Sequence, residues 1–76
     1  MGLKNVPLSV FREFLKYKGL NRIRTEGGHE IWSSKVLLRP VVLQTHIDPV
    51  PEFIIRTNLR TIGSTRKEFE TWLLSR

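Results

Sequence analysis

Two clusters of turn-forming residues constrain this chain more than any other feature of its sequence. Glycines at 27–28 and a Ser-Ser-Lys run at 33–35 divide the middle of the chain into three short runs with β-strand character. The runs cover residues 20–25, 29–33 and about 39–45. Connections this short favour antiparallel pairing of consecutive strands. The sequence therefore predicts a three-stranded antiparallel meander, with Pro40 at the start of the third strand or at an edge.

Helical patterns flank this segment on both sides. Residues 8–18 place apolar side chains at helical spacing, and a second helix is predicted from about residue 51 until Gly63 ends it. Thr65 and Glu68 then have the spacing of a capping box, which predicts the start of a third helix. The buried side of that helix is expected to carry Phe69, Trp72 and Leu73.

These elements predict an α-β-β-β-α order followed by an extra short C-terminal helix. A three-stranded sheet has an apolar face to cover, and the helices are the only elements available to cover it. We therefore expect an α+β fold of two layers that forms a single domain over residues 1–76. A chain this short buries only about 60% of its unfolded surface, so its core must be small.

The charge balance points to an anionic partner. Thirteen Lys and Arg residues against seven acids give a net charge of +6, and such surfaces attract polyanions, although a solubilising surface is the simpler interpretation. The chain has no cysteine, which excludes disulfides and thiolate chemistry and fits a reducing cytoplasm. No apolar run approaches the ~20 residues that span a bilayer, so no membrane partner is expected.

His29 is the leading candidate for chemistry. Gly27 and Gly28 before it either supply the positive φ of a hairpin turn, which makes His29 an ordinary strand-start residue, or clear space for a substrate backbone beside the imidazole. An imidazole with its ordinary pKa of about 6.5 exchanges protons near neutrality. Strand alternation predicts Arg22 and Arg24 on one face, from which they supply positive charge near the same turn.

The other candidate ligands and bases carry weaker signals. His46 ends the third strand, where ordinary polar contacts are the simplest expectation. A tight turn near 35–36 would place His29 opposite about 43–46, within reach of His46. Glu30 and Trp32 point to the face opposite His29, so Glu30 would not share an ion with it. His46 and Asp48 are too few for a closed metal site, and no metal is expected.

Basic residues also gather late in the chain. The second and third helices carry Arg56, Arg60, Arg66 and Lys67. They form either a solvated face or a phosphate-binding surface near helix ends.

The chain resembles the HicA family of toxin–antitoxin mRNA interferases over about residues 9–74. The resemblance rests on the segments "FREFLKYKGL", "NRIRTEGGHEIW", "RPVVLQTH" and "TNLRTIGSTRKEF". Its most specific element is Gly-x-His, although the family usually has Ser or Thr where this chain has Gly28. The insert "IDPVPEFII" replaces a shorter, lysine-rich link.

The resemblance implies a double-stranded-RNA-binding-domain-like fold and a metal-independent endoribonuclease that cleaves mRNA without a cofactor. It implies that His29 is the essential residue and that a HicB-like antitoxin protein binds the toxin and covers its site, in the cytoplasm of a bacterium or archaeon. With His29 as acid or base, we expect Arg22, Arg24 and Lys16 to hold phosphates. The second proton transfer would come from His46, from Tyr17, from water or from no group at all.

Two alternatives remain open. The first is a non-catalytic RNA-binding module, in which basic helix-end residues bind RNA and His29 is incidental. The second is an interaction protein whose positive charge serves an acidic partner.

Overall fold

The computed structural model describes residues 3–76 and has the expected order of elements. The elements are α1 (Leu8–Tyr17), β1 (Asn21–Glu26), β2 (His29–Ser33), β3 (Val41–Gln44), α2 (Glu52–Thr61) and α3 (Arg66–Leu74). The strands form one antiparallel sheet in the order β1-β2-β3, which confirms the predicted meander. The predicted bounds lie within two residues of those observed, because the turns that set them are local features of the sequence.

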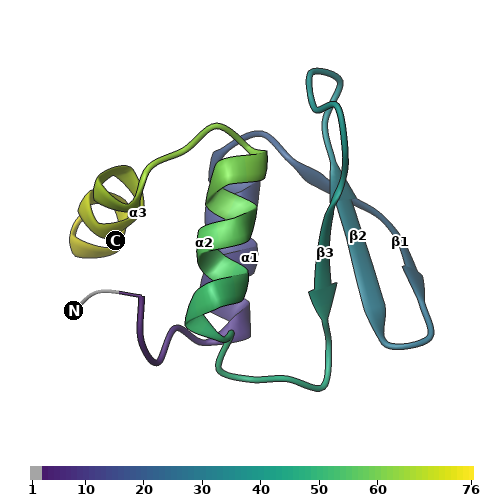
Figure 1. The fold of residues 1–76 in the computed structure, drawn as a ribbon, viewed down its shortest axis with the longest axis horizontal. Helices are drawn as coiled ribbons and strands as arrows, with labels where there is room; N and C mark the ends of the chain where they lie inside the picture. Colours follow the sequence, from purple (N-terminus) through teal and green to yellow (C-terminus); the bar gives the residue numbers. More distant parts are fainter. Residues whose placement is uncertain (1–2) are drawn as a thin grey trace.

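The helices lie to one side of the sheet. Figure 1 shows the strands on one side of α1 and α2, with α3 on the opposite side of these two helices. The apolar core lies between these elements. It includes Phe11, Phe14 and Leu15 of α1, Trp32, Val41 and Leu43 of the sheet, Ile55 and Leu59 of α2, and Phe69 of α3. Within residues 3–76, no helix is both long enough and apolar enough to cross a bilayer.

Aromatic side chains join α3 to α1. The ring centroid of Phe14 lies 4.8 Å from that of Phe69 and 5.2 Å from that of Trp72, in both cases edge to face. Phe69 is buried as predicted, whereas Trp72 and Leu73 are partly exposed. This α+β domain therefore covers one sheet face with two helices, and the third helix packs outside them.

The predicted capping box forms in part. The Thr65 hydroxyl accepts a hydrogen bond from the Glu68 N–H at 3.0 Å, as expected at the start of α3. The Glu68 carboxylate accepts a hydrogen bond from Lys18 at 2.8 Å and another from Ser64. These two hydrogen bonds hold the pKa of Glu68 below its ordinary value. Glu68 therefore ties α3 to the end of α1.

A β-bulge at Ile23 changes the predicted alternation of β1. Arg22 pairs with Trp32 and Arg24 pairs with Ile31, so Ile23 is an extra residue without a partner across the ladder. Directly paired residues lie on the same face. Arg22 therefore lies with Trp32 on the helix-covered face, and Arg24 lies with Ile31 on the other. The prediction that Arg22 and Arg24 share a face is wrong, because one inserted residue reverses the alternation.

The β1–β2 hairpin closes through the two glycines. Gly27 has φ +52° and Gly28 has φ +85°, and two successive positive values are the pattern of a two-residue type I′ turn. A Cβ on Gly28 would lie 3.7 Å from Thr45 Oγ1 and 3.8 Å from His46 Nδ1, which is ordinary contact. The requirement for glycine at position 28 therefore comes from the backbone angle and not from crowding.

Gly28→Ala is expected to lower the free energy of unfolding by about 1–2 kcal/mol, because a side chain is strained at this positive φ. Urea unfolding followed by circular dichroism measures the loss. Gly27→Asn is the matched control, since φ +52° lies in the left-handed region that asparagine tolerates. A Gly28→Ala variant as stable as the parent would contradict this account of the turn.

Candidate functional site

His29 occupies the first position of β2, directly after the glycine turn. It pairs with Glu26 on one side and with Gln44 on the other, so its side chain lies on the sheet face that the helices leave uncovered. We call this surface the open face. From the strand register it comprises Arg24, Glu26, His29, Ile31, Val42 and Gln44. His29 is exposed, and it makes no side-chain hydrogen bond or ion pair with residues 3–76.

Among the predicted phosphate-binding residues Arg22, Arg24 and Lys16, it is Arg24 that shares the open face with His29. It lies two residues from Glu26, the direct partner of His29, and is therefore a diagonal neighbour of the imidazole. Arg24 Nε lies 3.2 Å from Glu26 Oε1, and both side chains are mostly exposed. An exposed ion pair of this kind contributes little stability, so Arg24 can exchange Glu26 for an anionic ligand at small cost.

Arg22 and Lys16 lie on the other side of the sheet. Arg22 Nη1 lies 3.5 Å from the Glu30 carboxylate on the helix-covered face. Lys16 belongs to α1, the helix that packs against that face, and its side chain is exposed. The structure therefore does not bring Arg22 or Lys16 together with His29. The bulge in β1 places Arg22 on the helix-covered face. Lys16 lies away from His29 because it belongs to the helical layer and not to the sheet.

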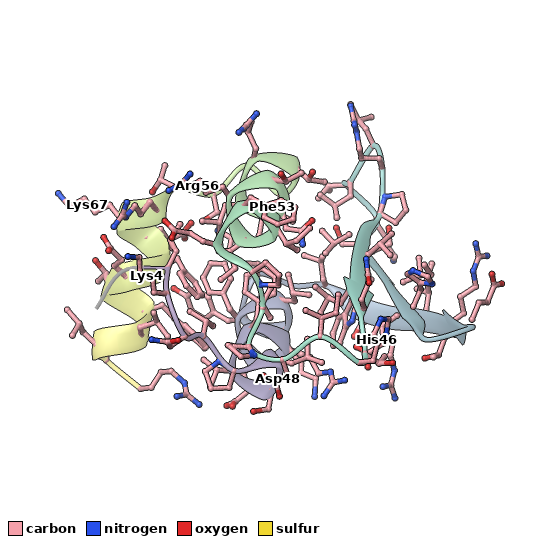
Figure 2. The ribbon with its side chains drawn as sticks, turned by 60° about the horizontal axis from the view of Figure 1, so that its bottom comes forward. Lys4, His46, Asp48, Phe53, Arg56 and Lys67 are labelled. Atoms are coloured by element: carbon pink, nitrogen blue, oxygen red, sulfur yellow. The ribbon has the colours of Figure 1, made fainter. Side chains whose placement is uncertain are left out.

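His46 lies at the same end of the sheet as His29. The prediction that His29 lies opposite residues 43–46 is confirmed, because His29 pairs with Gln44. Thr45 supports this register, since its N–H and its hydroxyl both donate to the Gly28 carbonyl, at 2.8 and 3.1 Å. The His46 side chain follows in the turn after β3 (Figure 2), and its Nδ1 lies 3.8 Å from where a Cβ on Gly28 would be. The two histidines thus flank the glycine turn.

Glu30 is the residue whose importance sequence reasoning missed. The residue is only 2% exposed, and its side chain lies on the helix-covered face as predicted. Its Oε1 accepts hydrogen bonds from Arg12 Nε and Trp32 Nε1, both at 3.0 Å, and Arg12 Nη2 reaches Oε2 at 2.5 Å. The only local signal was a carboxylate at a position whose strand alternation predicts burial. Glu30 therefore joins β2 to α1 beneath the candidate site.

The pKa of Glu30 reflects two opposing effects. Burial raises the pKa of the carboxyl, because it disfavours the charged form. Hydrogen bonds from Arg12 and Trp32, with the charges of Arg12 and Arg22, outweigh burial and hold the pKa below its ordinary value. Glu30 is therefore ionised at neutral pH and holds Arg12 against the sheet.

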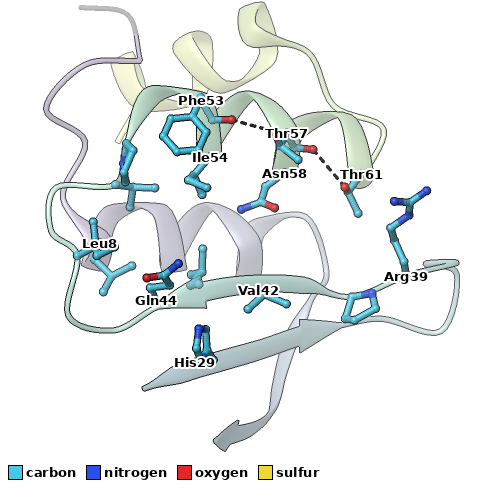
Figure 3. Close-up of a pocket in the computed structure, with 15 residues that line it drawn as sticks. Leu8, His29, Arg39, Val42, Gln44, Phe53, Ile54, Thr57, Asn58 and Thr61 are labelled. Atoms are coloured by element: carbon cyan, nitrogen blue, oxygen red, sulfur yellow. Dashed lines mark hydrogen bonds between the residues drawn. The ribbon is translucent and has the colours of Figure 1, made fainter. Parts of the chain in front are cut away.

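A groove runs between β3 and α2, and His29 lies on its border. It has a volume of about 450 Å³, within the range of ~300–1,000 Å³ that is typical of ligand pockets. Its walls are mostly apolar and include Val42, Phe53 and Ile54 (Figure 3). Asn58 of α2 also lines it, and sequence reasoning did not single this residue out.

The late basic residues divide into two pairs. Arg56 and Arg66 each form an ion pair one helical turn away, with Glu52 at 2.5 Å and Glu70 at 3.3 Å. Arg60 and Lys67 are exposed and form no ion pair with the part of the chain that the structure describes. Figure 2 shows Lys67 pointing outward at the start of α3. Arg60 and Lys67 are therefore available to anions in solution.

Residues 3–76 hold no group of three or more His, Asp or Glu side chains placed to ligate a metal. Asp48, the possible partner of His46, accepts a hydrogen bond from the Leu8 N–H at 2.9 Å and so caps α1. No family model, curated protein or solved structure matches this chain.

Proposed function

We propose that this protein is a HicA-like toxin, a metal-independent endoribonuclease that cleaves mRNA with His29 as its catalytic acid or base. The observation that carries the proposal is the placement of His29. Its imidazole is exposed on the open face, at the end of a glycine turn, and makes no side-chain hydrogen bond or ion pair with residues 3–76. The net charge of +6 favours a polyanionic substrate.

RNA supplies its own nucleophile in such a reaction. The ribose 2′-OH attacks the neighbouring phosphorus and the 5′-oxygen leaves, which requires only proton transfer and charge stabilisation. His29 takes the proton from the 2′-OH or gives one to the leaving oxygen. Arg24 stabilises the charge on phosphorus from the same face. His46, across the glycine turn, is the candidate for the second proton transfer.

The same proposal includes the fold family and the partner. An α-β-β-β-α core with both helices against one sheet face is compatible with a double-stranded-RNA-binding-domain-like fold. A HicB-like antitoxin would silence the enzyme by covering His29 on the open face. A bacterial or archaeal cytoplasm is the compartment that holds both mRNA and such a partner.

Cleavage of a purified mRNA fragment tests the proposal. The products are expected to carry 2′,3′-cyclic phosphate and 5′-hydroxyl ends, because the 2′-OH is the nucleophile. The rate is expected to be the same with and without EDTA. Strong inhibition by the chelator contradicts metal independence. RNA that remains intact with highly purified protein favours the second candidate function below.

The second candidate is a non-catalytic RNA-binding module, and the unpaired Arg60 and Lys67 favour it. Both are exposed cations at helix ends, where phosphate contacts are common. Such contacts position a nucleic acid without base readout. In this function His29 is an ordinary residue at a strand start.

A double variant in which Gln replaces both Arg60 and Lys67 is expected to show a weaker dependence of RNA affinity on salt concentration. The slope of log K against log salt falls in magnitude by about 0.7–0.9 for each phosphate that the variant no longer neutralises. Fluorescence anisotropy at several salt concentrations measures it. The control is Arg56→Gln with Arg66→Gln, which removes the same net charge from cations already paired with acids. Equal slopes for the two double variants would show that the effect is not local.

A further inference from the structure

The groove between β3 and α2 borders a free sheet edge. The sheet order places β3 at an edge. Thr45 donates its N–H to the carbonyl of Gly28, the residue before β2, and in an antiparallel ladder alternate residues direct their backbone groups to the same neighbour. Val42 and Gln44 therefore direct theirs away from β2. The Gln44 carbonyl accepts from the Ile47 N–H at 3.3 Å. This leaves both backbone groups of Val42 and the Gln44 N–H without a backbone partner in residues 3–76.

Asn58 adds a buried donor that lacks an acceptor. The residue is 7% exposed, and its Nδ2 has no hydrogen-bond partner within residues 3–76. Figure 3 shows the amide below α2, on the side that faces β3. A buried polar group without a partner destabilises a fold, so native proteins nearly always satisfy such groups. The missing acceptor is therefore expected from a ligand in the groove.

The lining of the groove decides between classes of ligand. His29 and Arg39 are its only titratable side chains, and Arg39 forms no ion pair with residues 3–76. The apolar side chains of Val42, Ile47 and Phe53 offer no partners to a phosphate chain. A second copy of this protein carries the same charge of +6, which disfavours self-association. An extended peptide suits the free edge, the apolar walls and Arg39 together.

We propose that this groove binds an extended segment of a partner protein, which adds to β3 as a fourth strand. Backbone groups of the segment pair with Val42 and Gln44, and one of its carbonyl oxygens accepts from Asn58. Alternate apolar side chains fill the groove, and an acidic side chain contacts Arg39. The proposal goes beyond RNA cleavage and does not depend on it, although a bound segment would also cover the border where His29 lies.

Phage-displayed random eight-residue peptides, selected on the folded protein, test the proposal. The enriched peptides are expected to alternate apolar residues and to carry an acid. A synthetic copy of the most enriched one is titrated into ¹⁵N-labelled protein, where it is expected to shift the amide signals of Val42 and Gln44. Asn58→Leu is expected to weaken its binding at least ten-fold and yet to raise Tm, because the variant removes a buried donor without an acceptor.

Gln44→Pro removes one edge donor and is expected to abolish binding, whereas the matched Gln44→Ala retains it. Three results would each overturn the proposal. The first is a selection that enriches no peptide, and the second is a set of amide signal shifts confined to other elements. The third is an Asn58→Leu variant that binds the peptide as tightly as the parent. Shifts of Val42 and Gln44 by a uridine hexamer that competes with the peptide would assign the groove to nucleic acid. Concentration-dependent dimerisation through β3 would assign it to a second copy.

Discussion

Replacing His29 by alanine is expected to lower the rate of RNA cleavage by a factor of about 10²–10⁴, which is the usual contribution of a general acid or base. The Tm and the RNA affinity of the His29→Ala variant are expected to stay near the parent values. The His29 side chain is exposed and makes no hydrogen bond with residues 3–76, so its removal leaves the core and the strand pairing intact. A gel assay with end-labelled RNA gives the rate, and anisotropy gives the affinity.

His46→Ala is the informative companion variant, because His46 lies at the same end of the sheet. If His46 carries the second proton transfer, its loss slows cleavage as well. A parent-like rate assigns that step to water or to Tyr17. Growth arrest on expression should follow the cleavage rates of the variants. A His29→Ala variant as active as the parent would remove His29 from the mechanism and leave RNA binding as the better function.

Replacing Glu30 by alanine is expected to destabilise the domain by about 1–3 kcal/mol, because it leaves the buried Trp32 Nε1–H without an acceptor and removes the ion-pair partner of the partly exposed Arg12. That loss is a large part of the total for a domain whose stability is typically about 5–15 kcal/mol. Arg12 loses both of its hydrogen bonds to the carboxylate, and Trp32 Nε1 loses its acceptor. Urea unfolding followed by tryptophan fluorescence measures the change.

The same carboxylate predicts how stability depends on pH. The pKa of Glu30 is lower in the folded protein than its ordinary value of 4.5. The contribution of Glu30 to the free energy of unfolding is therefore complete above about pH 4.5. It is lost as the pH falls through the pKa that Glu30 has in the folded protein. Glu30→Gln should flatten this acid limb. Glu13→Ala, which breaks the ion pair with Arg76 at the surface, is the control and should cost less than about 1 kcal/mol. Equal losses for Glu30→Ala and Glu13→Ala would contradict the burial argument.

The sequence by itself determined the elements and their local geometry. Turn residues at 27–28 and 33–35 set the ends of β2, and helical periodicity located α1. Alternation along β2 correctly separated Glu30 and Trp32 from His29. Such features depend on neighbours within a few residues, where backbone sterics and the spacing of side chains decide the outcome. The position of His29 on an exposed strand start belongs to this local level.

Only the tertiary structure decided which distant residues meet. The bulge at Ile23 sent Arg22 to the face opposite Arg24, and no pattern in the sequence marked the inserted residue. The contact of Arg12 with Glu30 spans 18 residues, and the groove brings Asn58 over β3. Such contacts depend on how helices and sheet pack, which is a sum of many small burial terms over the whole core. The spacing of residues along the sequence carries no information on that sum. The residues that surround His29 could therefore be identified only from the packed fold.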